Sequence, residues 1–303
     1  MTDAVNLMID SGAVNFYNRM VKGSTKGSPG NRFEDRLRED HSYVKSEEFL
    51  SYREKYIRFI KKNRRHITFY INLDIINNAQ GSYDSLKYLE SKGLSPLPVF
   101  HLGNDTKWLE KYIKEGYDFI CIGGITPNPW KAVKPALDKI WSEILTDRTG
   151  MPIVKVHGLA ATSYRLMTAY PWWSVDSSSW LKLAIYGNIA VPPRKNGKYR
   201  MDVAPYSAPV SIHRTKTKID KEDVLPTIKR KNRLLSREVM EWLNEIEVPV
   251  GTVNEMGDEV EWGVTSNWEA RSLANLRYFK RLADSMPKWP WSFKIHQKPK
   301  TLF

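Results

Sequence analysis

The apolar run "DFICI" at residues 118–122 ends in two glycines, Gly123 and Gly124. A short run of this kind, bounded by polar residues and rich in β-branched and aromatic side chains, is typical of a buried strand. A helical pattern at 105–116 precedes the run, and another at 133–144 follows it. A strand between two helices predicts a parallel sheet with helical crossovers.

The same alternation occupies the chain up to about residue 180. Ser46 is expected to cap a helix, and Ser82 to begin another that ends at Gly93. Five further runs are predicted to be strands: "VNLMI" (5–9), "ITFYINL" (67–73), "LPVFHL" (97–102), "PIVKV" (152–156) and "WWSV" (172–175). Six strands fit either an open doubly wound sheet or a (β/α)₈ barrel. No G-x-G-x-x-G follows the first strand, which disfavours the dinucleotide-binding version of the open sheet.

A barrel needs two more strands, and 183–191 and 198–204 are the candidates. The same two segments can instead pair as a β-hairpin beside the barrel. We therefore expect an α/β protein with a (β/α)₈, TIM-like barrel in residues 1–204, together with this hairpin.

The chain beyond residue 204 has a different character. A mixed, mostly basic run occupies 212–233, and helical patterns follow at about 236–246 and about 268–285. Residues 205–303 are therefore expected to form a basic C-terminal extension with helices, which packs on the barrel or completes it. The tail at 286–303 mixes Pro, Lys and aromatic residues, which fits either a peripheral strap or a nucleic-acid contact.

Composition bounds the function. The chain has 303 residues, 41% of them hydrophobic, and a single cysteine, Cys121, which excludes a disulfide framework within the chain and a Cys-rich zinc cluster. No apolar run approaches the roughly 20 residues that span a bilayer, so we expect a cytoplasmic protein without a membrane partner. The formal net charge of +13 predicts a polyanionic partner, most simply nucleic acid, although a basic surplus can also serve solubility alone.

Polar residues and glycines follow the predicted strands. In a parallel barrel, chemistry gathers at the carboxyl ends of the strands. The residues found there are, in order, Asp10-Ser11-Gly12, Asp74, His101, Gly123 with Gly124, His157 with Gly158, and Asp176. Three carboxylates at one edge predict either glycosyl chemistry or a metal site. A metal-dependent hydrolase that uses Asp10, Asp74, His101, His157 and Asp176 is therefore one alternative.

Several of these segments resemble the motifs of the tRNA-guanine transglycosylases, in the same order over roughly residues 10–200. "IDSGAVN" resembles their D-S-G-G-F-Q segment, "NLDII" their FDEC, "ICIGGI" their AIGGL and "SVDSSSW" their MFDCV, while "YGNIAVPPRKNGKY" is similar to their RNGTLF…DGK hairpin. The branch that it resembles most is the phage DNA-guanine transglycosylase-like proteins, often labelled queuine tRNA-ribosyltransferase. The resemblance implies a (β/α)₈ barrel that exchanges guanine for a 7-deazaguanine in DNA and, if phage-encoded, works in the bacterial host cytoplasm.

The resemblance also implies roles. Asp176 matches the nucleophile that attacks C1′ and forms a covalent glycosyl-enzyme, and Asp10 matches the general acid/base. Asp74 matches the carboxylate that reads the Watson–Crick edge of guanine, and Gly123 and Gly124 match backbone that approaches the base. The remaining expected substrate contacts are Ser11, Gly12, His101, His157 and Gly158.

The sequence departs from the family in three places. The Cys-x-Cys-x-x-Cys…His zinc site is absent, so no metal or other cofactor is expected. The family glutamine near the third strand is replaced around His101, and the "FQ" of the first motif is Val14-Asn15, where Phe16 or Tyr17 could supply the stacking ring.

The expected partners are DNA, with tRNA as the alternative, and a free 7-deazaguanine base such as 7-cyano-7-deazaguanine. A guanine in a duplex must be flipped out, or the DNA must be single-stranded. Phosphate contacts are expected at Lys61, Lys62, Arg64 and Arg65, and in the basic stretches 20–32 and 205–235. A barrel that binds nucleic acid without catalysis is a further alternative. The sequence does not indicate the oligomeric state.

Overall fold

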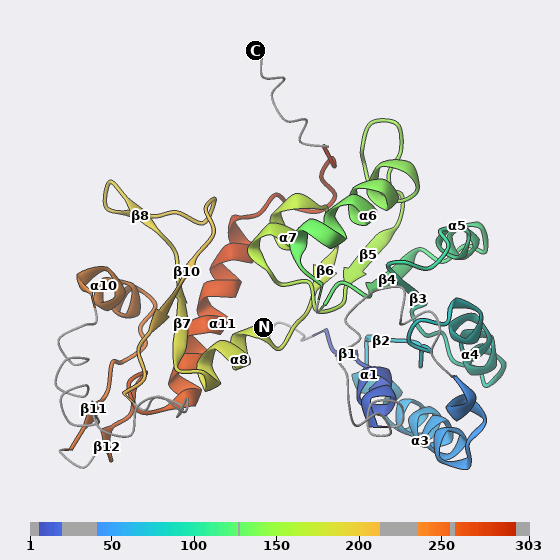
Figure 1. Ribbon diagram of the computed structural model, residues 1–303, viewed down its shortest axis with the longest axis horizontal. Coiled ribbons are helices and arrows are strands. Elements are labelled where there is room, and N and C mark those ends of the chain that lie inside the picture. Colours follow the sequence, from blue (N-terminus) through green and yellow to red (C-terminus); the bar gives the residue numbers. More distant parts are fainter. Residues whose placement is uncertain (1–5, 20–40, 127, 213–235, 255–257, 295–303) are drawn as a thin grey trace. The chain divides into compact units, whose positions relative to one another are not determined.

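The computed structural model describes residues 6–19, 41–126, 128–212, 236–254 and 258–294 (Figure 1). The chain forms two compact units: unit 1 comprises residues 1–161, 169–176 and 289–303, and unit 2 comprises 162–168 and 177–288. The predicted domain boundary after residue 204 lies inside unit 2, and the division of the chain into domains at that residue stays a prediction. Most of the basic run at 212–233, and all of 20–32, lie outside the described residues.

The six strands predicted before residue 180 all form in unit 1. They are β1 (Met8–Ile9), β2 (Phe69–Tyr70), β3 (Val99–His101), β4 (Phe119–Gly123), β5 (Lys155–Gly158) and β6 (Ser174–Val175). β1 pairs in parallel with β2, a parallel bridge joins Ile71 to Leu97, and β3 to β6 form a four-stranded parallel sheet in that order. Neighbours in sequence are thus neighbours in space. The parallel α/β class is confirmed, and the reversal of strand order that defines a doubly wound sheet does not occur among these strands.

Helices connect these strands, as predicted. They are α1 (Ala13–Tyr17), α3 (Glu47–Asn63), α4 (Ala79–Ser91), α5 (Lys107–Lys114) and α6 (Trp130–Glu143), with 3₁₀ turns η2 (Ser42–Lys45) and η3 (Arg64–His66). Ser46 caps α3, because its hydroxyl accepts the Phe49 N–H at 3.2 Å. The predicted start of α4 at Ser82 is wrong: Asn78 is the cap and accepts the Gly81 N–H at 2.8 Å. Ser82 lies buried inside the helix, where its hydroxyl bonds back to the main chain of Ile75.

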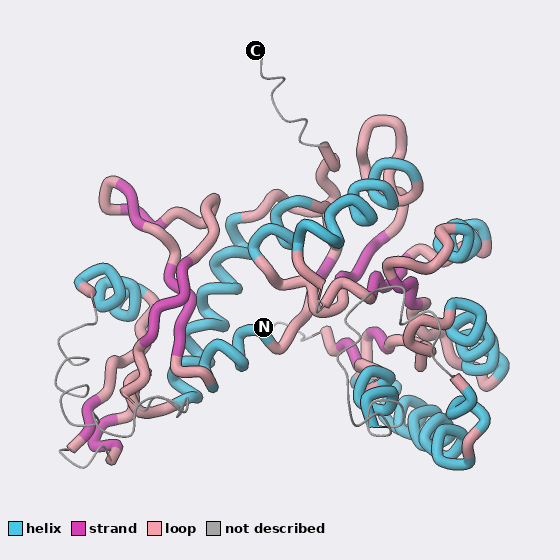
Figure 2. The backbone as a smooth tube through the Cα atoms, viewed as in Figure 1, coloured by secondary structure: helices cyan, strands magenta, loops and turns pink. Residues whose placement is uncertain are grey.

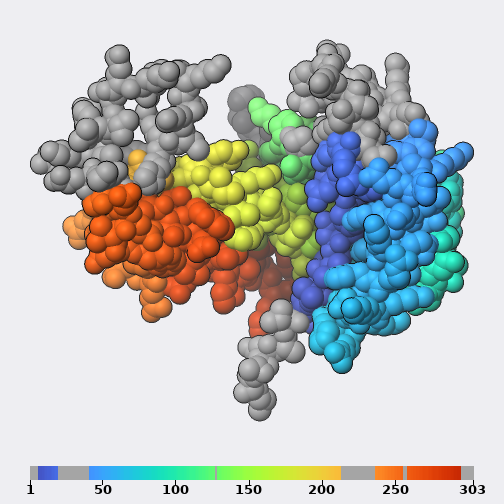
Figure 3. All heavy atoms as spheres, turned by 90° about the horizontal axis from the view of Figure 1, so that it is seen from below, coloured from blue at the N-terminus to red at the C-terminus, as the bar shows by residue number. Residues whose placement is uncertain are grey.

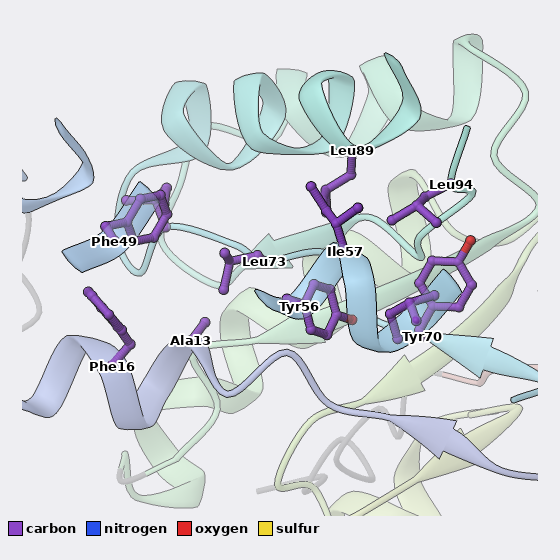
Figure 4. Close-up of a cluster of buried hydrophobic side chains, with 11 residues drawn as sticks. Ala13, Phe16, Phe49, Tyr56, Ile57, Tyr70, Leu73, Leu89 and Leu94 are labelled. Carbon is purple, nitrogen blue, oxygen red and sulfur yellow. The ribbon is translucent and has the colours of Figure 1, made fainter. Parts of the chain in front are cut away.

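One hydrophobic cluster fixes α1 and α3 against β2 (Figure 4). Phe16 from α1 meets Phe49 from α3 edge-on, with ring centroids 5.4 Å apart. Tyr56 from α3 donates its hydroxyl to the Ile71 carbonyl at 2.6 Å. The two helices lie side by side at the surface, as the blue atoms of Figure 3 show. This packing sets the position of the turn between β1 and α1.

A second aromatic group forms around Tyr170, which stacks on Phe293 with centroids 5.5 Å apart and lies near Trp141. Phe293 belongs to the tail, whose main chain there donates to the Gly150 carbonyl at 2.8 Å. Trp289 donates its ring N–H to the Pro171 carbonyl at 3.1 Å. The described part of the tail is therefore packed on unit 1, as expected of a strap.

Unit 2 contains antiparallel pairs and helices (Figure 2). Its elements are α8 (Ser179–Ile185), β7 (Asn188–Val191), β8 (Arg194–Lys195), β9 (Lys198–Tyr199), β10 (Tyr206–Pro209), α10 (Arg237–Glu245), β11 (Thr252–Val253), β12 (Glu259–Glu261) and α11 (Trp268–Ser285), and α7 (Tyr164–Ala169) begins in it. The two predicted C-terminal helices, α10 and α11, are confirmed.

The candidate strands of this region are only partly confirmed. Residues 183–185 belong to α8, so the first candidate strand shortens to β7, which pairs with β10. The second begins as β9 and pairs with β8. Asn196 and Gly197 form the turn between β8 and β9, with φ of 50° and 78°, as a tight hairpin requires. The two candidate segments therefore do not pair with each other, and the predicted β-hairpin between them is wrong: β9 instead pairs with β8, which lies in the predicted connection between them.

Candidate active site

The turn after β1 carries Asp10, and Tyr52 holds it in place. The Tyr52 hydroxyl donates to the Ser11 carbonyl at 2.7 Å, while the Ala13 N–H donates to the Ser11 hydroxyl at 3.3 Å. Gly12 has a φ of +74°, a conformation that favours glycine, and a Cβ there would overlap the Tyr52 hydroxyl. Ser11 and Gly12 therefore shape the turn, and Asp10 lies just beyond the end of β1, partly accessible to solvent.

The ends of β2 and β3 carry a buried acid–imidazole pair. His101 Nε2 lies 2.6 Å from Asp74 Oδ2, and both side chains are almost completely enclosed. Gly123 makes room for this pair, because a Cβ would lie 3.2 Å from the His101 ring. Gly124 has a φ of +74° and passes close to the Leu102 backbone. Internal packing thus already accounts for both glycines.

The ends of β5 and β6 support Asp176. Its Oδ1 accepts the Ala160 N–H at 2.8 Å and lies 3.6 Å from His157 Nε2. The other ring nitrogen of His157, Nδ1, lies 2.8 Å from the Ser174 hydroxyl. Gly158 is needed for packing, since a Cβ would lie 2.8 Å from the Ala161 Cβ.

The three carboxylates interact electrostatically. Partial burial, then the negative charges of Asp74 and Asp176, raise the pKa of Asp10, although the amides of Gly12 and Ser11 oppose the shift. Burial and the same three charges raise the pKa of the Cys121 thiol, which is fully enclosed on β4. The carboxylates at the ends of β1, β2 and β6 are therefore close enough for their charges to act on Asp10 and on Cys121.

Asp176 shows the opposite shift. Burial by itself would raise its pKa, but the His157 ring and the Ala160 amide outweigh that effect and lower it. Asp10 therefore retains its proton to a higher pH than an ordinary aspartate, and Asp176 loses its proton at a lower one. A pair of carboxyl groups whose environments separate their pKa values is the arrangement that divides acid and nucleophile roles between two like residues.

The predicted phosphate contacts lie at the other end of the sheet. Lys61, Lys62, Arg64 and Arg65 are exposed at the end of α3 and in η3, which lead into the amino end of β2. Asp74 follows the carboxyl end of that strand. At about 3.3 Å per residue, the eight residues from His66 to Asp74 separate the two places by up to roughly 25 Å. The cluster therefore adjoins the amino end of β2, and Asp74 follows the opposite end of the same strand.

Neither predicted stacking ring is available at the surface. Phe16 is 3% exposed and Tyr17 is 5% exposed, so both belong to the core in this structure. Trp172 is likewise buried, and Trp173 packs edge-on against Phe119 with centroids 4.7 Å apart.

Three supporting groups escaped the interpretation of the sequence. Tyr52 lies in the helix that Ser46 caps, and nothing in the sequence marks its hydroxyl as a partner of the turn after β1. Ser174 is a single polar residue in the apolar run "WWSV", a signal that could have been read. The role of the Ala160 amide could not be predicted from the sequence, because it depends on a φ of 56°, and an alanine gives no indication of such a conformation.

Two results bear on the other predicted classes. In the described residues, no group of three or more His, Cys, Asp or Glu side chains is placed to hold a metal ion, so the hydrolase alternative gains no support. No helix in that part of the chain has the length and apolar character needed to cross a membrane.

Comparisons of the chain with protein-family models, curated proteins and solved structures find no match.

Proposed function

We propose that this protein is a guanine transglycosylase that exchanges guanine for a 7-deazaguanine base in DNA through a covalent aspartyl-glycosyl intermediate. The observation that carries the proposal is the placement of Asp10 and Asp176 after the carboxyl ends of β1 and β6, where the Ala160 N–H holds Oδ1 of Asp176 at 2.8 Å; the contrast between their pKa shifts supports it. The pKa of Asp10 is raised by burial and by its acidic neighbours, whereas that of Asp176 is lowered by the His157 ring and the Ala160 amide against the effect of burial. An exchange that retains configuration at C1′ needs one carboxyl group that gives and takes a proton and one carboxylate that attacks carbon.

The exchange has two balanced steps. The Asp176 carboxylate attacks C1′ of the deoxyribose, the bond from C1′ to N9 of guanine breaks, and the departing base takes the proton of Asp10. The incoming 7-deazaguanine then gives its N9 proton to the Asp10 carboxylate, and N9 attacks C1′ and releases Asp176. The backbone of the nucleic acid stays intact, and no metal, oxidant or reductant is needed.

The buried pair of Asp74 and His101 suits recognition of the base. Asp74 Oδ2 is occupied by His101 Nε2 at 2.6 Å, which fixes the orientation of the carboxylate. A carboxylate is acceptor-only, and the Watson–Crick edge of guanine offers N–H donors. We assign Asp74 to that edge, with His101 as the residue that holds it.

The fold and the charge support the same proposal. The order of the strands from β1 to β6, which follow one another without reversal, is the order expected of a (β/α)₈ barrel. The net charge of +13 favours a polyanionic substrate.

The test is incorporation of labelled 7-cyano-7-deazaguanine into DNA and into tRNA, side by side. We expect incorporation into DNA with release of guanine, and a denaturant-stable protein–DNA adduct. Both should disappear in Asp176→Ala and persist in Asp84→Ala, a matched control at an exposed position on α4. Incorporation into tRNA alone would reassign the substrate. No incorporation into either, or an unimpaired Asp176→Ala variant, would refute the transglycosylase.

A further inference from the structure

We propose that His157 and Ser174 are positioning residues that hold Oδ1 of Asp176, so that Oδ2 is the atom that attacks C1′. This inference rests on the proposed function, because it names the reacting atom of the same site. It changes the role of His157, which the resemblance left as a substrate contact.

Both contacts to the Asp176 side chain fall on the same oxygen. The Ala160 N–H donates to Oδ1 at 2.8 Å, and His157 Nε2 lies 3.6 Å from Oδ1. The main chain adds two bonds: the Ala161 N–H donates to the Asp176 carbonyl at 3.0 Å, and the Asp176 N–H to the Gly158 carbonyl at 3.2 Å. Among the described residues, Oδ2 therefore has no side-chain partner, and it is the carboxylate oxygen free to form a bond to carbon.

The exposed fractions of the Asp176 and His157 side chains indicate which of them can reach a substrate. The side chain of Asp176 is 58% exposed, whereas that of His157 is 5% exposed. In a Ser-His-Asp hydrolase the serine attacks and the aspartate is the buried support. Here the aspartate is the accessible end, so the imidazole and the serine support it.

Ser174 can select the tautomer of His157 that puts a proton between the ring and Asp176. A hydroxyl can donate or accept. When Ser174 donates to Nδ1, the neutral ring carries its hydrogen on Nε2, which faces Oδ1. When the ring is doubly protonated, Ser174 accepts from Nδ1 and Nε2 still carries a hydrogen. The distance of 3.6 Å is longer than a hydrogen bond, and contacts of this kind commonly tighten when substrate binds.

The backbone next to Asp176 has the strain expected of a site built for this purpose. Ala160 has a φ of 56°, which is uncommon for a residue with a Cβ, and this conformation belongs to the segment that directs its N–H at Oδ1. The Thr126 hydroxyl donates to the Ala160 carbonyl at 3.1 Å and so helps to hold the segment. Backbone strain of this kind is concentrated at functional sites.

The test compares His157→Leu, His157→Gln and Ser174→Ala, with Ser142→Ala at an exposed position on α6 as the matched control for loss of a serine hydroxyl. His157→Leu should lower kcat for base exchange by about 10²-fold, the effect of misplacing a reacting group by about 1 Å, and leave KM for DNA unchanged. His157→Gln, whose amide can supply a donor where Nε2 stood, should recover most of the rate. Ser174→Ala should give a smaller loss, and Ser142→Ala none.

A second measurement does not depend on activity. Aspartate labelled with ¹³C at the carboxyl carbon reports the titration of Asp176, assigned with Asp176→Asn. The titratable groups that face Asp176 are His157 on β5, Asp10 on β1 and Cys121 on β4. Loss of the His157 contact should raise the titration midpoint of Asp176, and His157→Gln should restore part of the shift.

The outcomes separate the two proposals. A normal midpoint and normal exchange in His157→Leu would overturn the positioning role. Loss of exchange in Ser174→Ala as complete as in Asp176→Ala would overturn it too, by making the serine the reacting group. If the wild type exchanges no base but His157→Leu still raises the titration midpoint of Asp176, the contact between His157 and Asp176 is supported. Only the proposal of a transglycosylase is then refuted.

Discussion

Replacement of Gly12 by alanine should lower the free energy of unfolding by more than the cost of placing a Cβ on a left-handed backbone. An alanine at a φ of +74° costs about 1–2 kcal/mol. The new Cβ would also overlap the Tyr52 hydroxyl, which must then leave the Ser11 carbonyl that it bonds at 2.7 Å. Loss of that bond in a buried place adds about 1 kcal/mol or more. We therefore expect Gly12→Ala to lower the free energy of unfolding by about 2–4 kcal/mol.

Gly93 provides the matched control, since its φ is +76° and a Cβ there would meet nothing within 4 Å. Both glycines belong to unit 1, so urea unfolding of that unit reports both. Gly93→Ala should cost only the backbone contribution, and Gly12→Ala in a Tyr52→Phe background should fall to the same value. Equal losses for Gly12→Ala and Gly93→Ala, or no coupling between Gly12 and Tyr52, would refute the claim that Tyr52 fixes the turn that carries Asp10.

Four further predictions concern charge. Asp10→Asn should lower base exchange by about 10²–10⁴-fold, the usual contribution of a general acid/base, in a steady-state assay. The same variant should have a higher free energy of unfolding than wild type at neutral pH, because a raised pKa of Asp10 means that folding disfavours its charged form. This difference in stability, measured by urea unfolding, should vanish below the unfolded-state pKa of 3.8, where Asp10 is protonated in both states. His101→Leu leaves Asp74 buried without its partner and should cost about 3–5 kcal/mol, with a smaller cost when Asp74→Asn is added; equal costs would contradict the pairing. Charge reversal at Lys61, Lys62, Arg64 and Arg65 should flatten the salt dependence of DNA binding, measured by fluorescence anisotropy. It should leave kcat unchanged, since this cluster precedes the amino end of β2 whereas the carboxylates follow the carboxyl ends of their strands; a fall in kcat would contradict that separation.

The strands were predictable because each is encoded locally. A buried parallel strand needs a continuous apolar run bounded by polar residues, and "DFICI" and "PIVKV" have that pattern without reference to any other part of the chain. The residues after the strands were predictable for the same reason, since carboxyl ends of parallel strands meet at one edge. The carboxylates Asp10 and Asp74 were found in this way.

Residues 183–185 show where local pattern fails. The run "LAIYGNIAV" contains enough apolar residues for a strand, but its first residues complete α8, which packs on α11 from a distant part of the sequence. A short apolar run does not distinguish a buried strand from a buried helical turn, and the distant partner decides. The prediction of where α4 starts was wrong for a different reason. Asn78 and Ser82 are both residue types that cap helices, but the Ser82 hydroxyl bonds the buried main chain of Ile75 from inside the helix, and Asn78 is the cap.

The support of Asp176 was the least predictable part of the site, and the reason is physical. The sequence places Asp176 after an apolar strand, which explains where the carboxylate is but not which of its oxygens is free. That choice depends on the Ala160 N–H, on the His157 ring and on the Ser174 hydroxyl, which come from the ends of two neighbouring strands and the turn after the first. Each contact arises only when β5 and β6 lie side by side, with His157 opposite Ser174 and Gly158 opposite Val175. Because that register sets which oxygen is held, the chemistry of Asp176 follows from the pairing of two short strands rather than from the motif that contains it.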